Sequence, residues 1–548
     1  MKGTLKRYLR MSKTKILIFF LILLLSFLIR IPQLNFPSIG YHNMKENEYI
    51  SMARNMLNKK DLANREVDFY HAFDTKAGFE LYPQAPFIAY QVLLGYKLFG
   101  NNLWFPRLIN IIYMLFSIVC IFYLVQILTG EYFFGIGASF LLAVMPLGVY
   151  FARNLQPESG AFLFMLIGNL MWFNFISRFR RGYLLGFAVS LVMTAAYKMS
   201  FLIGFIALPF LLAYRSYFSE RKIKGLIADL GIVILPCLLF IAYCIATGQT
   251  SFSSCENRVN ILSVFTPSYW KQNLSVILYY AVRENFTPVY SVLFIIGLLL
   301  AWKRYRTDKS LFAKYLRLWS LTVVLYCMVF SDYINQHNYY QFPFLGFFIL
   351  AVIYALREIS VFICSYLKTK KVSYCFAVLF IVIFVFAASS AKQAIANHYN
   401  TVFVGTDVAG QLLKERAAKD EKFFIYTIAQ GYATCVYAER KCGYPASLEE
   451  FKKIESGSHV RFVVFYPISM LNSVDPKMRD YIIKTHHIIM VGFRFEMARI
   501  FPEIMILEKG GSVDFAAFIR QNQKRLKLAK VYRTLNRLIP FYIMEENK

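Results

Sequence analysis

The sequence predicts an α-helical polytopic membrane protein with about eleven transmembrane helices and a small C-terminal α/β domain. Three observations lead to this fold class. Of the 548 residues, 57% are hydrophobic, whereas soluble domains are about 45–50% apolar. Apolar runs long enough to cross a bilayer recur throughout residues 1–391. Lys and Arg gather in four of the five connections on the N-terminal side of the membrane.

The first predicted membrane span is the apolar run at residues 16–31. It follows a basic N-terminal segment, and no small-residue cleavage site follows it, which predicts an uncleaved signal-anchor helix. Ten further runs of about 15–24 residues fit the length of a membrane helix. They are residues 105–128, 131–150, 159–177, 183–197, 200–214, 225–246, 288–302, 316–330, 340–356 and 374–391.

Positive charge predicts the orientation of the chain. Several connections on the N-terminal side of the membrane are rich in Lys and Arg, as in "SRFRRG", "RSYFSERKIK" and "KRYRTDKSLFAKYLR". Because such loops stay in the cytoplasm, we expect a cytoplasmic N-terminus. Because Lys and Arg collect in such loops, a basic balance, here a net charge of +29, is expected of a membrane protein, and nucleic acid is not an expected partner. This orientation places five segments on the outer side of the membrane. They are a large first outer loop at residues 32–104, the residues 151–158, 247–287 and 331–339, and everything after residue 391.

Residues 392–548 form a second predicted domain, outside the membrane. The β-like runs "FFIYTI", "RFVVFYPI" and "HIIMVGFRF" alternate with the helix-like runs "AGQLLKERAAKD" and "SLEEFKKI", which is typical of a small α/β domain. The basic stretch "RQNQKRLKLAKVYRTLNRLIPFY" predicts an amphipathic helix that is either solvated or bound at an anionic membrane surface. Cys435 and Cys442 are consistent with an extracytoplasmic disulfide or with two free thiols.

Polar residues of the first outer loop gather in "GYHNMKENEYISMARNML", which supplies His42, Lys45, Glu46, Glu48 and Arg54. Lys45 and Glu48 are three residues apart and therefore share one face of a predicted helix. An ordinary surface helix with one ion pair explains this stretch. A carboxylate that acts as a base beside a cation explains it too.

Further ionisable and aromatic residues fall on the same predicted side of the membrane. They are Arg153, Glu158, Lys198, Asp332, His337, Tyr339 and Tyr340. Ionisable groups within or beside the membrane are costly and are usually functional. Because these residues all fall on the outer side, we predict a functional site at the outer boundary of the membrane.

Four stretches carry a resemblance to a known family. They are "YISMARNML", "YPQAPFIAYQVLLGYKLFGNNLWFPRL", "YFARNLQPES" and "HNYYQFPFLGFF". In this order and on one face, they resemble the polytopic glycosyltransferases of the GT-C fold, in the branch of protein O-mannosyltransferases and lipid A aminoarabinose transferases. The resemblance spans about residues 15–450.

The resemblance implies an inverting glycosyltransferase in a bacterial inner (plasma) membrane, where membrane lipids are in contact with it. It would move a sugar from a polyprenyl-phosphate donor to a hydroxyl of a glycan, lipid or protein at the outer face. Such a donor needs cations for its phosphate and a carboxylate for the acceptor hydroxyl. A divalent metal is possible, although no ligand spacing demands one. The expected substrate-binding residues are His42, Lys45, Arg153, Glu158, Lys198, His337, Tyr339 and Tyr340.

The catalytic acid of the first loop is either Glu46 or Glu48. Many family members carry Asp-Glu-x-x-Tyr-x-x-x-Ala-Arg, and here Glu46 fits the Glu while Lys45 replaces the Asp. A bacterial subgroup carries His-x-Trp-Arg-Gln-x-Asp-Thr, in which Glu48 takes the Asp place. Two residues turn a helix by about 200°, so only one of the two acids faces a site. We predict Glu48, because Lys45 shares its face.

Three other functions compete with this prediction. A transporter has many spans too, but transporters usually show matched halves or interrupted midplane helices, and the sequence shows no matched halves. A lipid-oligosaccharide polymerase or ligase usually carries its large loop late in the chain. A non-catalytic relative would bind a lipid-linked sugar without transferring it.

Overall fold

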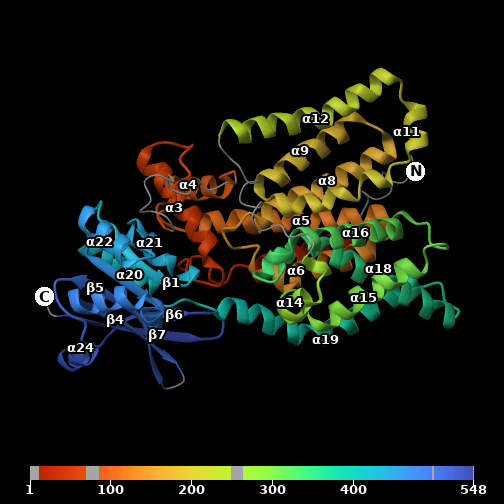
Figure 1. Cartoon of the computed structure of the whole chain (residues 1–548). Coiled ribbons are helices and arrows are strands. Elements are labelled where there is room, and N and C mark those ends of the chain that lie inside the picture. The colour runs from red at the N-terminus through yellow and green to blue at the C-terminus, as the bar shows by residue number, and fades with distance from the viewer. Residues whose placement is uncertain (1–11, 70–84, 248–262, 459, 497–498, 547–548) are drawn as a thin grey trace. The chain divides into compact units, whose positions relative to one another are not determined.

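The computed structural model describes residues 12–69, 85–247, 263–458, 460–496 and 499–546 (Figure 1). Most of the basic N-terminal segment, residues 70–84 of the predicted first outer loop and residues 248–262 of the predicted 247–287 loop lie outside the described residues. The chain divides into two compact units, named here the helical unit and the sheet unit. The helical unit comprises residues 1–32, 83–85 and 107–395, and the sheet unit comprises residues 33–82, 86–106 and 396–548.

The helical unit is built from apolar helices, and two of them, α5 and α19, run from one unit into the other. Its helices are α2 (Lys13–Leu28), α5 (Trp104–Thr129), α6 (Tyr132–Val144), α7 (Pro146–Tyr150), α8 (Glu158–Arg178), α9 (Arg181–Tyr197), α10 (Ile203–Ile206), α11 (Tyr214–Glu220), α12 (Ile223–Ala246), α14 (Pro267–Tyr279), α15 (Pro288–Lys303), α16 (Leu311–Val329), α17 (Ser331–Ile334), α18 (Leu345–Tyr366) and α19 (Val372–Asn400). Short 3₁₀ segments are η1 (Met199–Leu202), η2 (Pro209–Leu211) and η5 (Asn338–Phe344).

These helices make the chain a multi-pass membrane protein, although the predicted number of eleven spans is not confirmed. Six described helices are long and apolar enough to cross a membrane, or up to eight if each of two bent pairs counts as one span. Each predicted run falls on helical segments, but some are broken. The run at 131–150 breaks before Pro146, which lacks the N–H that would continue α6. The run at 200–214 consists of short helical pieces.

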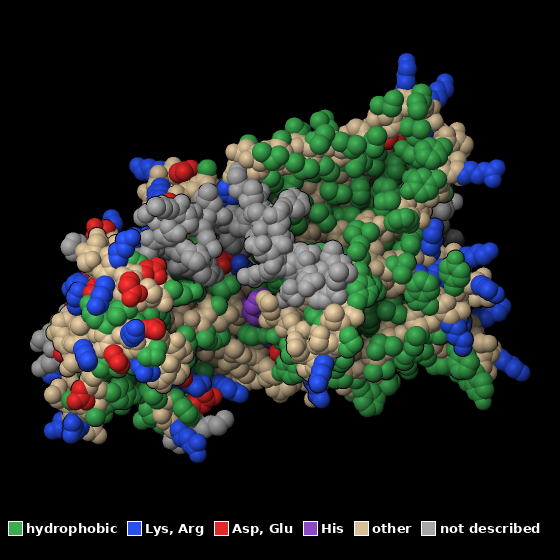
Figure 2. All heavy atoms as spheres, in the orientation of Figure 1, with side chains coloured by type: hydrophobic (Ala, Val, Ile, Leu, Met, Phe, Trp, Pro, Cys, Tyr) green, Lys and Arg blue, Asp and Glu red, His purple; other side chains and the backbone are tan. Residues whose placement is uncertain are grey.

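The helices α12 and α19 expose most of their apolar side chains. Only 6% of the most apolar window of α12 and 11% of that of α19 are buried inside the protein. Figure 2 shows hydrophobic side chains over the visible helices of this unit, and Lys and Arg side chains at the end where α11 lies. Because apolar surface of this extent is unfavourable in water, these helices face lipid.

Residues 247–287, predicted as an outer loop, contain helix α14. The chain continues from α14 through a π-helical turn, Tyr280–Asn285, and then bends by 110° into α15. Trp270 and Leu274 are exposed on α14. The polar residues 271–273 interrupt the apolar pattern, and for this reason hydropathy did not reveal the helix.

Two glycines let helices of the helical unit approach closely. A Cβ on Gly297 of α15 would lie 2.1 Å from the carbonyl oxygen of Ala351 in α18. A Cβ on Gly160 of α8 would lie 2.4 Å from the ring of Tyr197 in α9. Both separations are too short for non-bonded atoms, so these positions need the smallest residue. Close small-residue contacts of this kind hold helices together in lipid.

The sheet unit contains a seven-stranded mixed sheet in the order β2-β1-β3-β5-β4-β7-β6. The neighbours β2, β1 and β3 run parallel, and the other pairs are antiparallel. The strands are β1 (Phe423–Thr427), β2 (Cys442–Gly443), β3 (Phe462–Tyr466), β4 (His486–Glu496), β5 (Arg499–Lys509), β6 (Lys527–Arg533) and β7 (Leu538–Glu545). The main helices are α3 (Asn43–Lys59), α4 (Phe87–Phe99), α20 (Thr406–Arg416), α21 (Ala433–Ala438), α22 (Leu448–Gly457), α23 (Pro476–Thr485) and α24 (Phe515–Asn522).

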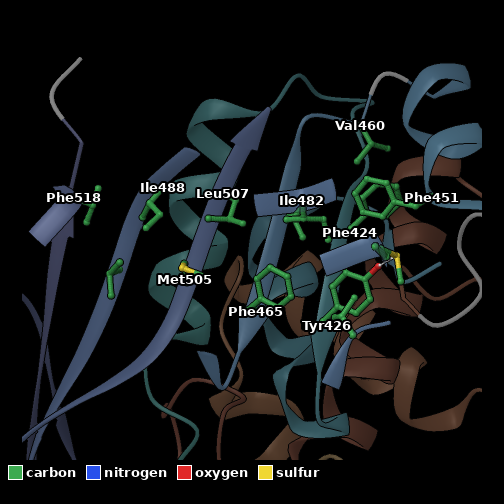
Figure 3. Close-up of a cluster of buried hydrophobic side chains, with 14 of the residues drawn as sticks. Phe424, Tyr426, Phe451, Val460, Phe465, Ile482, Ile488, Met505, Leu507 and Phe518 are labelled. Carbon is green, nitrogen blue, oxygen red and sulfur yellow. Dashed lines mark hydrogen bonds between the residues drawn. The ribbon is translucent and has the colours of Figure 1, made fainter. Parts of the chain in front are cut away.

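This sheet confirms the predicted C-terminal α/β fold, including the three strands and two helices that the sequence indicated. Phe424, Phe451 and Leu507 belong to a buried core between the sheet and its helices (Figure 3). Much of the first-loop segment clusters with this region. The division of the chain into residues 1–391 and 392–548 stays a prediction.

The basic stretch near the C-terminus is a β-hairpin, and the prediction of an amphipathic helix was wrong. The helix α24 ends at Asn522, and β6 and β7 then form the edge of the sheet. Ile539, Phe541 and Ile543 are buried at every second position of β7. This two-residue period suits a strand, and pairing with β4 satisfies the backbone of β7.

Cys435 and Cys442 form a disulfide, with 5.9 Å between their Cα atoms. This resolves the two alternatives that the sequence left open. The bond joins α21 to β2 at one edge of the sheet. Disulfides persist in oxidising compartments and are rare in the cytosol.

Candidate functional site

The first-loop helix α3 is held within the sheet unit by one apolar face. Tyr49, Met52, Ala53 and Met56 are each at most 1% exposed. Their spacing of i, i+3, i+4 and i+7 is that of one helix face. Within this unit, α3 lies against α4 and α21. The polar residues of the first loop are therefore presented from a firmly packed helix.

Lys45 and Glu48 form an ion pair on α3. The Nζ atom of Lys45 donates to both carboxylate oxygens of Glu48, at 3.1 and 2.9 Å. The Glu48 side chain is only 2% exposed, whereas 28% of the Lys45 side chain is exposed. The two side chains are in contact, as their spacing predicts. Their catalytic and binding roles stay a prediction.

Glu46 lies on a different side of α3 and has different partners. The hydroxyl of Ser38 donates to Glu46 Oε2 at 2.8 Å, and the side-chain amide of Asn47 donates to the carbonyl of Ser38 at 3.0 Å. Glu46 is 4% exposed. Its carboxylate therefore holds the segment that enters α3, while the carboxylate of Glu48 meets the ammonium of Lys45.

His42 directly precedes α3. Its backbone is left-handed, with φ of 54°, and its ring centroid lies 4.1 Å from that of Tyr41. Tyr41 in turn stacks on His398, with 5.3 Å between the ring centroids. His42 thus belongs to an aromatic group at the N-terminal end of α3.

Arg54 holds α3 in place, and its main partner, Asp68, was missed by the sequence analysis. Arg54 forms an ion pair with Asp68 and donates to the carbonyl of Val436 at 2.5 Å. Asp68 also accepts from the hydroxyl of Ser51 at 2.8 Å and from the amide of Asn55 at 3.0 Å. Ser51, Arg54 and Asn55 lie at i, i+3 and i+4 on α3, which is the pattern that could have indicated a shared partner.

Glu158 and Lys198 form a second ion pair, in the helical unit. Glu158 opens α8, and Lys198 directly follows α9. Their side chains are 1% and 10% exposed. The Nζ atom of Lys198 also lies 4.7 Å from the ring centroid of Tyr339 and 4.8 Å from that of Tyr340. These distances permit cation–π attraction, so the ammonium of Lys198 is stabilised from two directions.

His337 extends this aromatic group. Its ring stacks on Tyr339 with 5.1 Å between centroids and 7° between planes, and the Tyr339 and Tyr340 centroids are 5.1 Å apart. All three residues lie in or beside η5, which therefore supplies the aromatic group beside Lys198. The side chain of Asp332, from the same stretch, lies outside the described residues.

Arg153 is the other predicted cation of the helical unit. It is 3% exposed and lies in the turn between α7 and α8. Its guanidinium is 5.6 Å from the ring centroid of Tyr150. A buried guanidinium supplies up to five donors in a fixed plane, which suits it to bind phosphate.

Arg30 is a buried cation that the sequence analysis did not single out. It is 0% exposed and donates to the carbonyls of Ala143 and Gly148, each at 2.9 Å. These bonds satisfy the backbone where α6 ends and the chain enters α7. Its place within the apolar run 16–31 was a usable signal, because an ionisable residue there needs buried partners.

The predicted site residues form two groups, each described within its own unit. The first-loop group consists of His42, Lys45, Glu46 and Glu48. The bundle group consists of Arg153, Glu158, Lys198, His337, Tyr339 and Tyr340. Among the described residues, no three His, Cys, Asp or Glu side chains are placed to hold a metal ion. A divalent metal stays a prediction.

Comparisons with known proteins bear on the fold and the class of the chain. The family model for dolichyl-phosphate-mannose-protein mannosyltransferases matches residues 83–241, which include Arg153, Glu158 and Lys198. The oligosaccharyltransferase of Archaeoglobus fulgidus, in complex with Zn and sulfate, is similar over 89% of this chain and 73% of that chain, with 11% identity and a TM-score of 0.53. AglB from the same organism, in complex with an inhibitory peptide and a dolichol-phosphate, is similar over 89% and 74%, with 11% identity and a TM-score of 0.54.

The chain is a glycosyltransferase of the GT-C fold. The archaeal structures establish the fold, and the family model adds the transferase class. The structure of apo ArnT from Cupriavidus metallidurans is similar over 90% of this chain and 97% of that chain, with 12% identity and a TM-score of 0.49. No curated protein sequence matches the chain. The predicted fold class and glycosyltransferase activity are confirmed, and the transporter alternative is not favoured.

Proposed function

We propose that this glycosyltransferase moves a sugar from a polyprenyl-phosphate donor to a hydroxyl of a glycan, lipid or protein acceptor, with inversion at the anomeric carbon. The matching family is described by its dolichyl-phosphate-mannose donor, and the AglB structure contains a dolichol-phosphate. A polyprenyl tail is soluble in the lipid that surrounds helices such as α12 and α19. The donor can therefore reach the enzyme from within the bilayer.

We assign the role of general base to Glu48. Its carboxylate accepts the proton of the acceptor hydroxyl while the hydroxyl oxygen bonds to the anomeric carbon. The bond between that carbon and the phosphate oxygen breaks, and polyprenyl phosphate leaves with the electron pair. Attack from the face opposite the leaving group inverts the anomeric carbon. Lys45 balances the charge of the carboxylate in the resting enzyme.

We assign binding of the donor phosphate to the bundle group. Lys198 and Arg153 are buried cations, and charge-assisted hydrogen bonds to phosphate are among the strongest that proteins make. Glu158 holds Lys198, and the rings of Tyr339 and Tyr340 border its ammonium. Positive charge fixed in this way stabilises the negative charge that develops on the leaving phosphate.

The observation that supports this assignment most strongly is the burial of Glu48. A surface helix with an ordinary ion pair would leave both side chains in water, but the carboxylate of Glu48 is 2% exposed. Removing a carboxylate from water costs several kcal/mol unless partners compensate it. Glu46 is buried as well but accepts from the hydroxyl of Ser38, so Glu48, the buried carboxylate with a cation beside it, is the better candidate for the base.

We also propose the location that the sequence predicts: a bacterial inner membrane, with a cytoplasmic N-terminus and the sheet unit outside. The basic loops support this orientation, and so does the Cys435–Cys442 disulfide, which suits an oxidising compartment. Alkaline phosphatase fused after residue 400 should be active, and green fluorescent protein at the same position should be dark. The opposite pair of results would overturn the orientation.

The activity can be tested with purified enzyme in nanodiscs. A panel of short-chain polyprenyl-phosphate sugars should release polyprenyl phosphate in the presence of an extract of the host's envelope glycans, lipids and proteins. Mass spectrometry of the same envelope fractions with and without the gene would identify the acceptor, and NMR of the product would show the inverted linkage. Retention of anomeric configuration would exclude the single-displacement mechanism. Specific donor binding without any transfer would favour the non-catalytic alternative.

A further inference from the structure

The turn of the β6–β7 hairpin is attached to the end of a membrane helix. The side-chain oxygen of Asn400, the last residue of α19, accepts from the hydroxyl of Thr534 at 2.7 Å and from the backbone N–H of Asn536 at 3.1 Å. The turn is closed by the N–H of Thr534, which donates to the carbonyl of Arg537 at 2.9 Å. Both partners of this attachment belong to the sheet unit.

The length of α19 limits how far this turn can lie from the bilayer. The apolar part of α19 ends at Ala391, and Lys392 is the first charged residue after it. Nine further residues of continuous helix lead to Asn400, which corresponds to a rise of about 13 Å. A headgroup layer is about 5–8 Å thick. The turn therefore lies within about one Debye length of the headgroups, and closer if α19 is tilted.

One face of the hairpin is apolar and exposed. Val531 is paired with Pro540, and Arg533 is paired with Leu538, so their side chains share one face of the two strands. Val531 is 42% exposed and Leu538 is 64% exposed. Leu535, at the tip of the turn, is 39% exposed. The opposite face carries the buried Tyr532 and Ile539, which anchor the hairpin in the sheet unit.

The same segment is strongly basic. Residues 520–540 contain seven Lys and Arg residues and no acid. Lys530 is paired with Asp407, and Arg537 with Glu496. Arg533, on the apolar face, is exposed and makes no ion pair among the described residues. Exposed aliphatic side chains around an unpaired cation suit the interface of an anionic bilayer.

We propose that the outer face of the β6–β7 hairpin, formed by Val531, Arg533, Leu535 and Leu538, docks on the headgroups of an anionic bilayer beside the end of α19. From the sequence, lipid contact was expected only through an amphipathic helix, with a solvated helix as the alternative, whereas the structure offers a strand face and a turn. This contact would fix the sheet unit, and with it α3, against the membrane surface. It does not depend on the proposed transfer reaction.

Photo-crosslinking of the full-length protein tests this contact. Benzoylphenylalanine replaces Leu538 in one variant and the 53% exposed Tyr444 in a control. Tyr444 directly follows β2, at the opposite edge of the same sheet. Nanodiscs contain either phosphatidylcholine alone or phosphatidylcholine with about 30% phosphatidylglycerol, an anionic lipid. The position-538 probe should crosslink to lipid about fivefold more in the anionic discs, and the excess should vanish at about 1 M salt.

A matched charge change locates the effect on the hairpin face. Arg533→Gln should remove most of the anionic excess at position 538, while Arg520→Gln, which removes an exposed charge from α24, should leave it unchanged. Equal crosslinking to lipid at positions 538 and 444 would overturn the proposal. An equal loss of the anionic excess in Arg533→Gln and Arg520→Gln would overturn it too. Crosslinks from position 538 to a second copy of the chain, or to no lipid at all, would overturn it as well.

Discussion

The two Lys–Glu ion pairs among the candidate site residues are built in opposite ways. Lys45 and Glu48 are three residues apart on one helix, and the Lys45 side chain is 28% exposed. Glu158 and Lys198 are 40 residues apart and almost fully buried, and η5 adds two aromatic rings from a third part of the chain. The first pair is a local feature of α3, whereas the second exists only because three segments pack together.

This difference has an energetic consequence. A helical pair with both partners in water is worth about 0.2–0.5 kcal/mol. The Lys45–Glu48 pair should be worth more because its carboxylate is buried, but less than a fully buried pair because 28% of the Lys45 side chain is exposed. Breaking a buried pair costs about 3–5 kcal/mol, because the remaining charge is left without compensation. We therefore expect the Lys45–Glu48 pair to matter mainly for catalysis, and the Lys198–Glu158 pair to matter for stability as well as for donor binding.

The largest expected effect is the loss of transfer in Glu48→Gln. This change keeps the shape of the side chain and removes the base, which typically lowers the rate by about 10²–10⁴. The measurement is turnover at saturating donor and acceptor in nanodiscs. Glu46→Gln is the matched control and should stay close to wild type, because the partner of Glu46 is Ser38. Loss of transfer in Glu46→Gln with normal turnover in Glu48→Gln would reverse the assignment.

The second-largest expected effect is a difference in the free energy of unfolding between variants of the two ion pairs. Lys198→Met should lower the free energy of unfolding by about 3–5 kcal/mol, since Glu158 stays buried. Lys45→Met should cost less than Lys198→Met, because the Lys45 side chain is 28% exposed and the Lys198 side chain only 10%, so water can more easily take the place of the Lys45 ammonium. Thermal unfolding in detergent gives the comparison, and Lys198→Met combined with Glu158→Gln should recover much of the loss. If the two single variants melt alike, the contrast between the pairs is wrong.

A smaller effect is expected where a glycine maintains the buried pair. Gly160→Ala places a methyl group against the ring of Tyr197, the residue before Lys198, and should cost about 1–3 kcal/mol and raise the KM for the donor. Gly231→Ala on α12 is the control, because a Cβ there meets no atom within 4 Å. It should be neutral or slightly stabilising. Normal donor KM in Gly160→Ala would show that the site does not depend on this contact.

The smallest effect is the response to salt. Raising the ionic strength from about 0.1 to 1 M shortens the Debye length from about 10 to 3 Å, which screens exposed charges more than buried ones. The difference in melting temperature between wild type and Lys45→Met should therefore shrink at high salt. The difference between wild type and Lys198→Met should persist. Equal screening of both would mean that water reaches the bundle pair.

Much of the fold followed from local patterns in the sequence. Hydropathy located each apolar run, because lipid-facing helices must be apolar at almost every position. It did not locate α14, whose pattern is broken by polar residues 271–273. Local patterns also failed to decide the structure of the basic stretch near the C-terminus. A run of Lys and Leu residues permits a helix or a strand, and only pairing with β4 and the burial of alternate side chains made it a strand.

The sequence by itself determined the membrane character of the chain, the α/β alternation of its C-terminal part and the contact between Lys45 and Glu48. These features depend on residues within one helix or one strand, so a period or a spacing is enough to predict them. Only the tertiary structure decided that Arg54 meets Asp68, that Cys435 joins Cys442, and that Lys198 lies between Glu158 and two tyrosines. Such contacts join residues that chain packing brings together, and no local period encodes that packing.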